Sequence, residues 1–186
     1  MLKRLSLILL SALVMATPAR AALKVVTTVP DLAALVAEVG GEHVRVTTMS
    51  SPHQDPHYVD PKPSLVVAVA RADLLVVNGL ELEIGWLPPI IVNSRNMAVQ
   101  VGATGHFDAS LYADVQEVPA QANRAMGDIH PGGNPHYLYD PRQAAKLAIA
   151  IGNKLAELDS ERRAFYSSSS KAVAEQLQKI AQAQTE

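Results

Sequence analysis

The sequence predicts an α/β fold: a Rossmann-like lobe with a mainly parallel four-stranded sheet flanked by helices, ending in a long C-terminal helix. Short runs rich in branched apolar residues alternate with helical patterns, which is typical of a parallel sheet covered by helices. Two runs, Leu23 to Thr28 and Asp73 to Asn78, are apolar enough to be buried on both faces. From Pro141 onward the pattern favours helix almost to the end of the chain.

Four segments are expected to form the strands. Each combines branched apolar residues with flanking turn residues, and Gly79 closes the third. In chain order, the predicted strands cover residues 23–28, 44–49, 73–78 and 98–101.

Five segments are expected to form helices. Proline or serine in a first turn marks several of the starts, which lie near Pro30, Ser64, Leu82, Pro141 and Ser160. The third of these helices is disturbed by a glycine and two prolines. The stretch from Gly102 to Asn134 has little periodicity and is expected to be a long loop, which in a compact domain tends to be functional or disordered.

The first residues predict export. Lys3 and Arg4 form a basic start, Leu5 to Ala16 is apolar apart from serines, and Ala19 to Ala21 offers small residues to a signal peptidase. A membrane anchor is the alternative, but the apolar run is shorter than the about 20 residues that a spanning helix needs. We therefore expect a signal peptide over residues 1–21 and a periplasmic location.

The composition limits which metal ligands and which binding partners the chain can have. The 186 residues contain no cysteine, so the core alone holds the domain, lipid attachment at a new N-terminal Cys is not expected, and a metal site would use His, Asp or Glu. Lys3, Arg4 and Arg20 leave with the leader, so 13 of 16 basic residues remain against 18 acidic ones. Without a basic patch, and with 4% aromatic residues, the chain is not expected to bind nucleic acid, and we expect a monomer.

Two histidine-containing segments stand out, His53 to Pro61 and His130 to Pro141. Each contains Pro-His-Tyr soon followed by Asp-Pro just before a predicted helix, and together they hold four of the six histidines. Proline before His57 and before His136 restricts the backbone, so each imidazole can be presented without a large ordering cost on binding. The first segment also follows the second predicted strand, where parallel sheets place ligand sites.

Neutral imidazoles suit zinc and similar metals, so His57 and His136 are the candidate metal ligands. The alternative for either segment alone is a structural histidine that hydrogen-bonds its own turn, and the near-duplication of the segments favours the ligand role. His130 could bind metal directly or pass it inward. The other candidates are expected to be solvent-exposed, turn-forming, rim or packing residues: His43, His53, His106, Asp60, Asp140, Glu81, Glu83 and Trp86.

The strings DPHYVDPKPS, GLELEIGWL and GNPHYLYDP occur in this order and resemble segments of the zinc- and manganese-type solute-binding proteins of ABC importers. The resemblance runs from about Leu23 to the end of the chain. It implies that His57 and His136 are the metal ligands of the family's amino-terminal lobe. It further implies two α/β lobes joined by a long helix, with a His or Glu and an Asp from the second lobe, and delivery of the metal to a membrane permease.

The expected organisation is a signal peptide at 1–21, a metal-binding lobe at 22–158 and the start of an inter-lobe helix at 159–186, with the second lobe absent. The expected function is capture of a divalent metal ion by a protein that is not an enzyme. Zinc is favoured because the site is rich in imidazole, and manganese stays open. The alternatives are a truncated fragment that binds metal weakly or not at all, and a zinc-dependent hydrolase.

Overall fold

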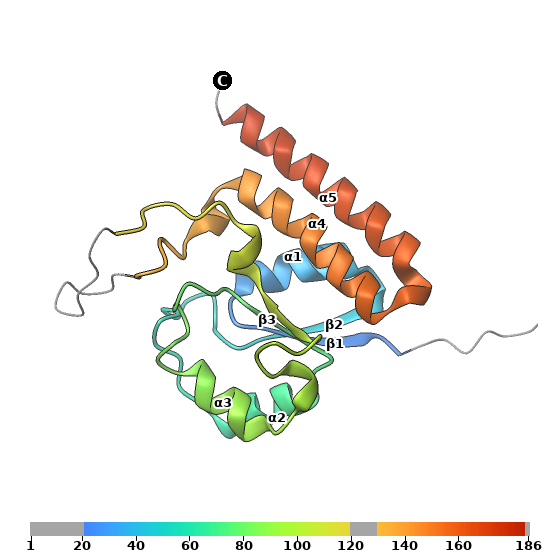
Figure 1. Ribbon diagram of the computed structural model, residues 1–186. Helices are drawn as coiled ribbons and strands as arrows, with labels where there is room; N and C mark the ends of the chain where they lie inside the picture. Colours follow the sequence, from blue (N-terminus) through green and yellow to red (C-terminus); the bar gives the residue numbers. More distant parts are fainter. Residues whose placement is uncertain (1–20, 120–129, 185–186) are drawn as a thin grey trace, which may run out of the picture.

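The computed structural model describes residues 21–119 and 130–184, so the expected signal peptide lies outside the described residues except for Ala21. One sheet contains four parallel strands in the order β2-β1-β3-β4 (Figure 1). The strands are β1 (Leu23–Thr27), β2 (Val44–Thr48), β3 (Leu74–Val77) and β4 (His106–Asp108). The predicted fold class is confirmed.

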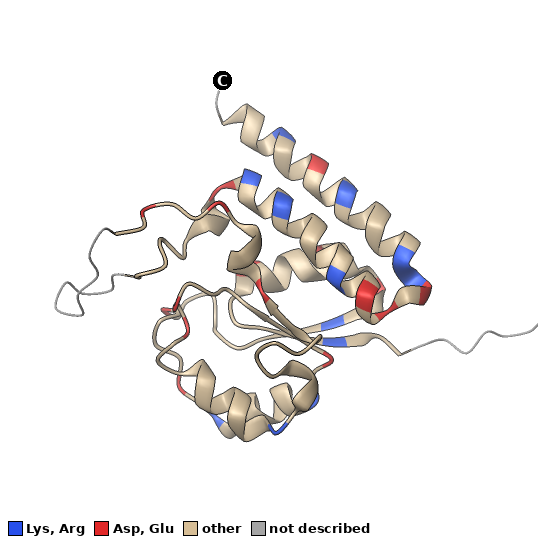
Figure 2. Ribbon diagram, viewed as in Figure 1, with Lys and Arg blue, Asp and Glu red and all other residues tan. Residues whose placement is uncertain are grey.

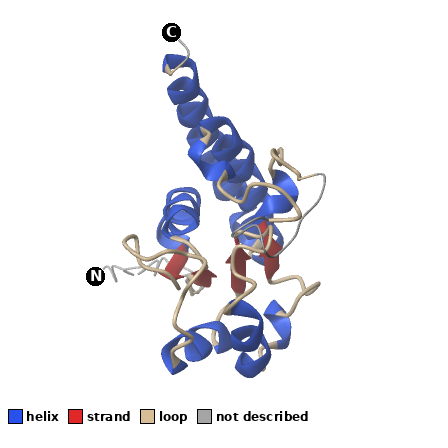
Figure 3. Ribbon diagram, turned by 90° about the vertical axis from the view of Figure 1, so that its left-hand side faces the viewer, coloured by secondary structure: helices blue, strands red, loops and turns tan. Residues whose placement is uncertain are grey.

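Helices cover both faces of the sheet. They are α1 (Pro30–Gly40), α2 (Pro63–Ala70), α3 (Leu87–Ser94), α4 (Pro141–Leu158) and α5 (Arg163–Ala183). Helices α1, α4 and α5 lie on one side, and α2 and α3 lie on the other, with the strands between the two layers (Figures 1 and 3). None of the described helices is long and apolar enough to cross a membrane.

Side-chain alternation along the strands separates the core into two clusters. Val25, Leu74 and Val76 belong to the cluster that includes α1, α4 and α5, and Val26 and Leu75 belong to the cluster that includes α2 and α3. Successive side chains of a strand point to opposite faces, so an apolar run is needed when both faces are covered. This is why the central strand β3 has no polar face, whereas β2 alternates buried or half-buried residues with the exposed Arg45 and Thr47.

The prediction of a strand at 98–101 is wrong. Met97–Val99 is a 3₁₀ turn, held in place because the Asn96 side chain accepts a hydrogen bond from the Ala98 amide (3.1 Å) and donates to the carbonyls of Val69 (2.9 Å) and Ala72 (2.8 Å). The fourth strand is β4, inside the predicted loop. It is three residues long and only Phe107 is buried, so it has no detectable hydrophobic period.

Two helix starts also differ from the prediction. Helix α2 begins at Pro63, and no side-chain hydrogen bond caps it, so Ser64 is not the cap. Helix α3 begins at Leu87 rather than Leu82, since the chain first passes through a turn in which Leu80 and Glu81 have positive φ angles of 53° and 62°.

The C-terminal helix packs along α4 and also contacts α1, while α2 and α3 contain no charged residue (Figures 1 and 2). At the α4–α5 corner the carboxylate of Asp159 is fully buried. It accepts hydrogen bonds from the Arg162 guanidinium (2.6 Å) and from the Tyr166 hydroxyl (3.0 Å). This polar contact joins the residue that follows α4 to the first turn of α5.

The buried hydroxyl of Tyr166 at the α4–α5 corner is expected to make the chain less stable in alkali. Burial, and then the hydrogen bond to Asp159, raise the pKa of Tyr166 from 10.0 to about 12. The folded chain therefore keeps a phenol neutral that the unfolded chain ionises, so this stabilisation is complete below pH 10 and is lost as the pH rises through 12. Between these pH values, the urea midpoint of the chain should fall more steeply than that of Tyr166→Phe. If the urea midpoints of the two proteins fell in parallel over this pH range, Tyr166 would not be the group responsible.

Candidate metal centre

Three segments meet at the edge of the sheet where the parallel strands end. The loop that contains His57 follows β2, the turn that begins at Asn78 follows β3, and the loop that contains His136 precedes α4. The side chain of Asn78 donates to the carbonyl of Pro135 (2.9 Å), which places the third segment against the second. This edge is where open parallel sheets bind ligands.

The two histidine loops share one local structure. The side chain two residues before each histidine accepts that histidine's backbone N–H: Asp55 Oδ1 from His57 and Asn134 Oδ1 from His136, both at 2.9 Å. Asp and Asn commonly stabilise turns in this way. Each loop therefore contains an Asx-Pro-His turn, in which Asp or Asn stabilises the backbone of the candidate ligand two residues later.

The carbonyl that precedes each histidine is also fixed by a more distant residue. The indole N–H of Trp86 donates to the Pro56 carbonyl at 2.8 Å, and the Asn78 side chain donates to the Pro135 carbonyl at 2.9 Å. In addition, the Tyr137 hydroxyl donates to the carbonyl of Asn78 at 2.6 Å. Trp86 was expected to serve only in packing, so its hydrogen bond to the histidine loop is an additional role.

A buried carboxylate supports this arrangement. Glu83 is 4% exposed, and its two oxygens accept the backbone N–H groups of Asn78 (2.7 Å) and Gly79 (3.2 Å). Burial raises the pKa of Glu83 against the opposing effect of these hydrogen bonds. The prediction that Glu83 is a surface charge is therefore wrong, whereas Glu81 is exposed as expected.

The structure brings His57 and His136 together. Their ring centroids are 5.8 Å apart with an interplanar angle of 63°, and both rings line an open cavity of about 470 Å³ together with His130, Asn134 and Glu117. His130 Nε2 lies 3.0 Å from His57 Nε2. Among the described residues, no three or more His, Asp or Glu side chains are already arranged as a complete metal-binding group.

The electrostatics favour neutral imidazole and ionised carboxylate in this pocket. Partial burial, followed by the neighbouring rings of His57 and His130, lowers the pKa of His136, which leaves a lone pair available to a cation. The hydrogen bonds from His57 lower the pKa of Asp55. The His57 Nδ1 lies 2.7 Å from Asp55 Oδ1, an arrangement that orients ligating histidines in many metal sites.

The remaining candidates lie elsewhere. His53 is exposed, the His43 ring packs on Phe165 with centroids 4.5 Å apart, and His106 Nδ1 contacts the Val99 carbonyl at 3.1 Å. Asp60 is exposed in the first loop.

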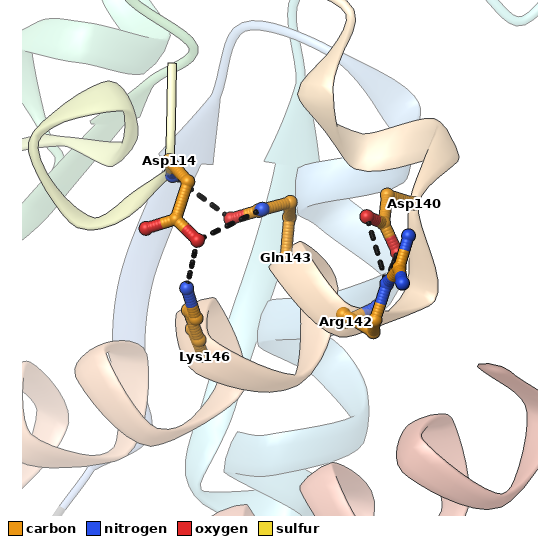
Figure 4. A network of polar contacts seen from close by, with 5 residues as sticks. All are labelled: Asp114, Asp140, Arg142, Gln143 and Lys146. Atoms are coloured by element: carbon orange, nitrogen blue, oxygen red, sulfur yellow. Dashed lines mark hydrogen bonds and ion pairs between the residues drawn. The ribbon is translucent and has the colours of Figure 1, made fainter. Parts of the chain in front are cut away.

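Asp140 is the N-cap residue of α4, in agreement with the expected helix-start role. It accepts the backbone N–H of Arg142 at 2.8 Å and pairs with its guanidinium. Figure 4 shows that contact beside a second one, in which Asp114 pairs with Lys146 and with the side chain of Gln143. The contacts of Asp114 attach its segment to the first turns of α4, next to the histidine loop.

Sequence reasoning missed the residues that position the histidines. Asp55 and Asn134 had a visible signal, since each stands two residues before its histidine in the repeated motif. Asn78 and Trp86 had none, because their partners lie 57 and 30 residues away. Glu117, whose carboxylate accepts from the Asn134 side chain at 2.7 Å, lies in a stretch without a pattern.

The comparisons first define a class, the substrate-binding proteins of metal ABC transporters, which are not enzymes. Residues 25–186 match the family model for ZnuA, the periplasmic component A of the zinc-uptake complex, and the chain belongs to this family.

Curated relatives and solved structures agree with this assignment. The chain is 28% identical to the manganese-binding lipoprotein MntA of Halalkalibacterium halodurans and 28% identical to the manganese ABC transporter substrate-binding lipoprotein PsaA of Streptococcus pneumoniae, over 85% and 86% of its length. A zinc-bound deletion mutant of ZnuA superposes with a TM-score of 0.72 at 25% identity, covering 87% of this chain and 56% of that one. The chain spans about half the length of the curated relatives, 47% of MntA and 49% of PsaA.

Proposed function

We propose that this chain captures a divalent metal ion, zinc, outside the cytoplasm and supports its delivery to the permease of an ABC importer. In this proposal His57 and His136 are ligands, and residues 1–21 direct export to the periplasm. Lobe residues 22–158 hold the metal, and residues 159–186 begin the helix that leads to a second lobe in two-lobed relatives.

The observation that carries the proposal is the approach of the two rings. A zinc–nitrogen distance of about 2.0–2.1 Å puts the ring centroids of two ligating imidazoles about 5–6 Å apart. The centroids of His57 and His136 are 5.8 Å apart, in one open pocket at the ligand-binding edge of the sheet. The hydrogen bonds to Pro56 and Pro135 hold both loops in place, which lowers the ordering cost of binding.

Zinc is favoured over manganese by the chemistry of the pocket. Imidazole suits zinc, whereas manganese sites are richer in carboxylate and water. Two curated relatives are named for manganese and several solved relatives for zinc, so the metal needs its own test. Titration of the purified chain should show one tightly bound zinc ion that a tenfold excess of manganese does not displace. Tight manganese binding with weak zinc binding would contradict the zinc assignment.

We further propose that the chain as given binds zinc more weakly than a longer relative such as ZnuA in the same assay. His57 and His136 fill half of a four-coordinate shell, and further ligands and exclusion of water would come from residues beyond these.

A neighbour of the ligands offers a finer test. Asp55→Asn keeps an oxygen for the turn but removes the charge that faces His57 Nδ1. Zinc affinity should fall about tenfold, the lower end of the about 10- to 100-fold that hydrogen-bond partners of metal-binding histidines typically contribute. The matched control is Asp60→Asn, an exposed carboxylate in the same loop, which should bind zinc like the unmodified chain. Equal affinities for both variants would show that Asp55 does not position the ligand.

A further inference from the structure

A third imidazole enters the pocket from the segment before His136. The Nε2 atoms of His130 and His57 are 3.0 Å apart although the residues are separated by 73 positions in the sequence, and their ring centroids are 5.2 Å apart. Both Nε2 atoms therefore face the same small volume.

The opposite nitrogens show which atoms carry hydrogen. His130 Nδ1 lies 2.8 Å from the carbonyl of Leu80, and His57 Nδ1 lies 2.7 Å from the carboxylate of Asp55. Both oxygens can only accept, so both Nδ1 atoms donate, and in neutral rings the two Nε2 atoms present lone pairs. Two lone pairs at 3.0 Å repel each other, so this separation requires a proton or a metal cation between the two nitrogens.

The separation fits ligands of one metal ion. Two nitrogens about 2.0–2.1 Å from a tetrahedral zinc are about 3.3–3.4 Å apart, so a movement of a few tenths of an ångström would place both at ligand distance. His136 is an exposed residue whose ring stacks on that of Tyr139 with centroids 6.0 Å apart, and turning toward the same ion would exchange this surface contact for a metal bond.

His130 is held in this position by a strained turn. Gly79, Leu80 and Glu81 have successive positive φ angles of 83°, 53° and 62°. Glycine adopts this conformation readily, whereas for residues with a Cβ atom, such as Leu80 and Glu81, it is unfavourable. This turn directs the Leu80 carbonyl at His130 Nδ1. On the other side, the amide of Gly133 donates to the His130 carbonyl at 3.0 Å, and Gly133 itself has a φ of 111° that favours glycine.

We propose that His130 is a third imidazole ligand of this lobe, so that one divalent cation is bound by Nε2 of His57, His130 and His136 in a shell completed by water or another donor. This rests on the proposed function and deepens it, since three protein nitrogens from a single lobe form a zinc-type site with one open position. The His57–His130 contact is the first half of that site, and the movement of His136 completes it.

Direct observation of the bonds tests the proposal. The chain, labelled with ¹⁵N in its histidines, is loaded with ¹¹³Cd²⁺, and one-bond couplings between cadmium and ring nitrogens are recorded. We expect three coupled imidazoles, assigned to His57, His130 and His136 by single substitutions. Coupling at His57 and His136 alone would overturn the role of His130 and leave the proposed function standing, whereas absence of binding would overturn both.

Affinity provides an independent readout. His130→Ala should weaken zinc binding about tenfold in competition with a chromophoric chelator, while His53→Ala, an exposed histidine of the first loop, should leave it unchanged. Circular dichroism of the metal-free variants establishes that they fold. Unchanged zinc affinity in a folded His130→Ala variant would overturn the proposal.

Discussion

Replacing His57 or His136 with alanine is expected to weaken zinc binding at least tenfold. Each substitution removes a proposed ligand whose backbone the chain holds in place with an Asx-Pro-His turn and a hydrogen bond to the preceding carbonyl. A tenfold loss corresponds to about 1.4 kcal/mol of binding free energy, which is modest for one ligand of a metal ion. The measurement is a zinc titration against a competing chelator at constant pH and ionic strength.

The control for both variants is His53→Ala. It removes an imidazole that is exposed in the same loop as His57 without changing the turn. Normal zinc affinity in the His57 and His136 variants, or an equal loss in the His53 variant, would show that the metal is bound elsewhere or through unspecific histidine contacts.

The second large effect concerns stability. Glu83→Ala is expected to lower the free energy of unfolding by about 2–4 kcal/mol, because it leaves the amides of Asn78 and Gly79 without their carboxylate partner inside the protein. The same change should weaken zinc binding, since Asn78 holds the Pro135 carbonyl beside His136. Urea denaturation of the metal-free chain measures the first effect separately from the second.

Glu81→Ala is the matched control, two residues away with the same charge change. Its side chain is exposed, so its unfolding free energy should stay within about 0.5 kcal/mol of the unmodified chain. Equal destabilisation of the two variants would mean that the hydrogen bonds of Glu83 do not support the turn after β3.

Much of the fold follows from hydrophobic pattern. Strands β1, β2 and β3 were predictable within a residue or two, because apolar runs between turn residues have few other uses in a chain with helical patterns between them. Strand β4 was not, since one buried residue, Phe107, gives no period. The start of α3 was misplaced because positive φ at Leu80 and Glu81 has no reliable signal in non-glycine residues.

The candidate site divides in the same way. His57 and His136 could be found because each lies in a turn formed by neighbouring residues, and the same short motif occurs twice in the sequence. The supporting contacts of Trp86, Asn78 and Leu80 connect segments between 30 and 57 residues apart, and only the folded chain brings them together. The prediction for Glu83 was wrong because nothing in the sequence distinguishes it from the exposed Glu81, two residues earlier, or indicates that its carboxylate is buried against the backbone.

The central claim is that His57 and His136 bind one metal ion. Diffraction from zinc-loaded crystals, recorded on both sides of the zinc absorption edge, tests it most directly. We expect one anomalous peak per chain in the pocket at the end of the parallel strands, about 2.0–2.1 Å from a ring nitrogen of each histidine. A peak outside this pocket, or rings that turn apart with no ion between them, would contradict the claim.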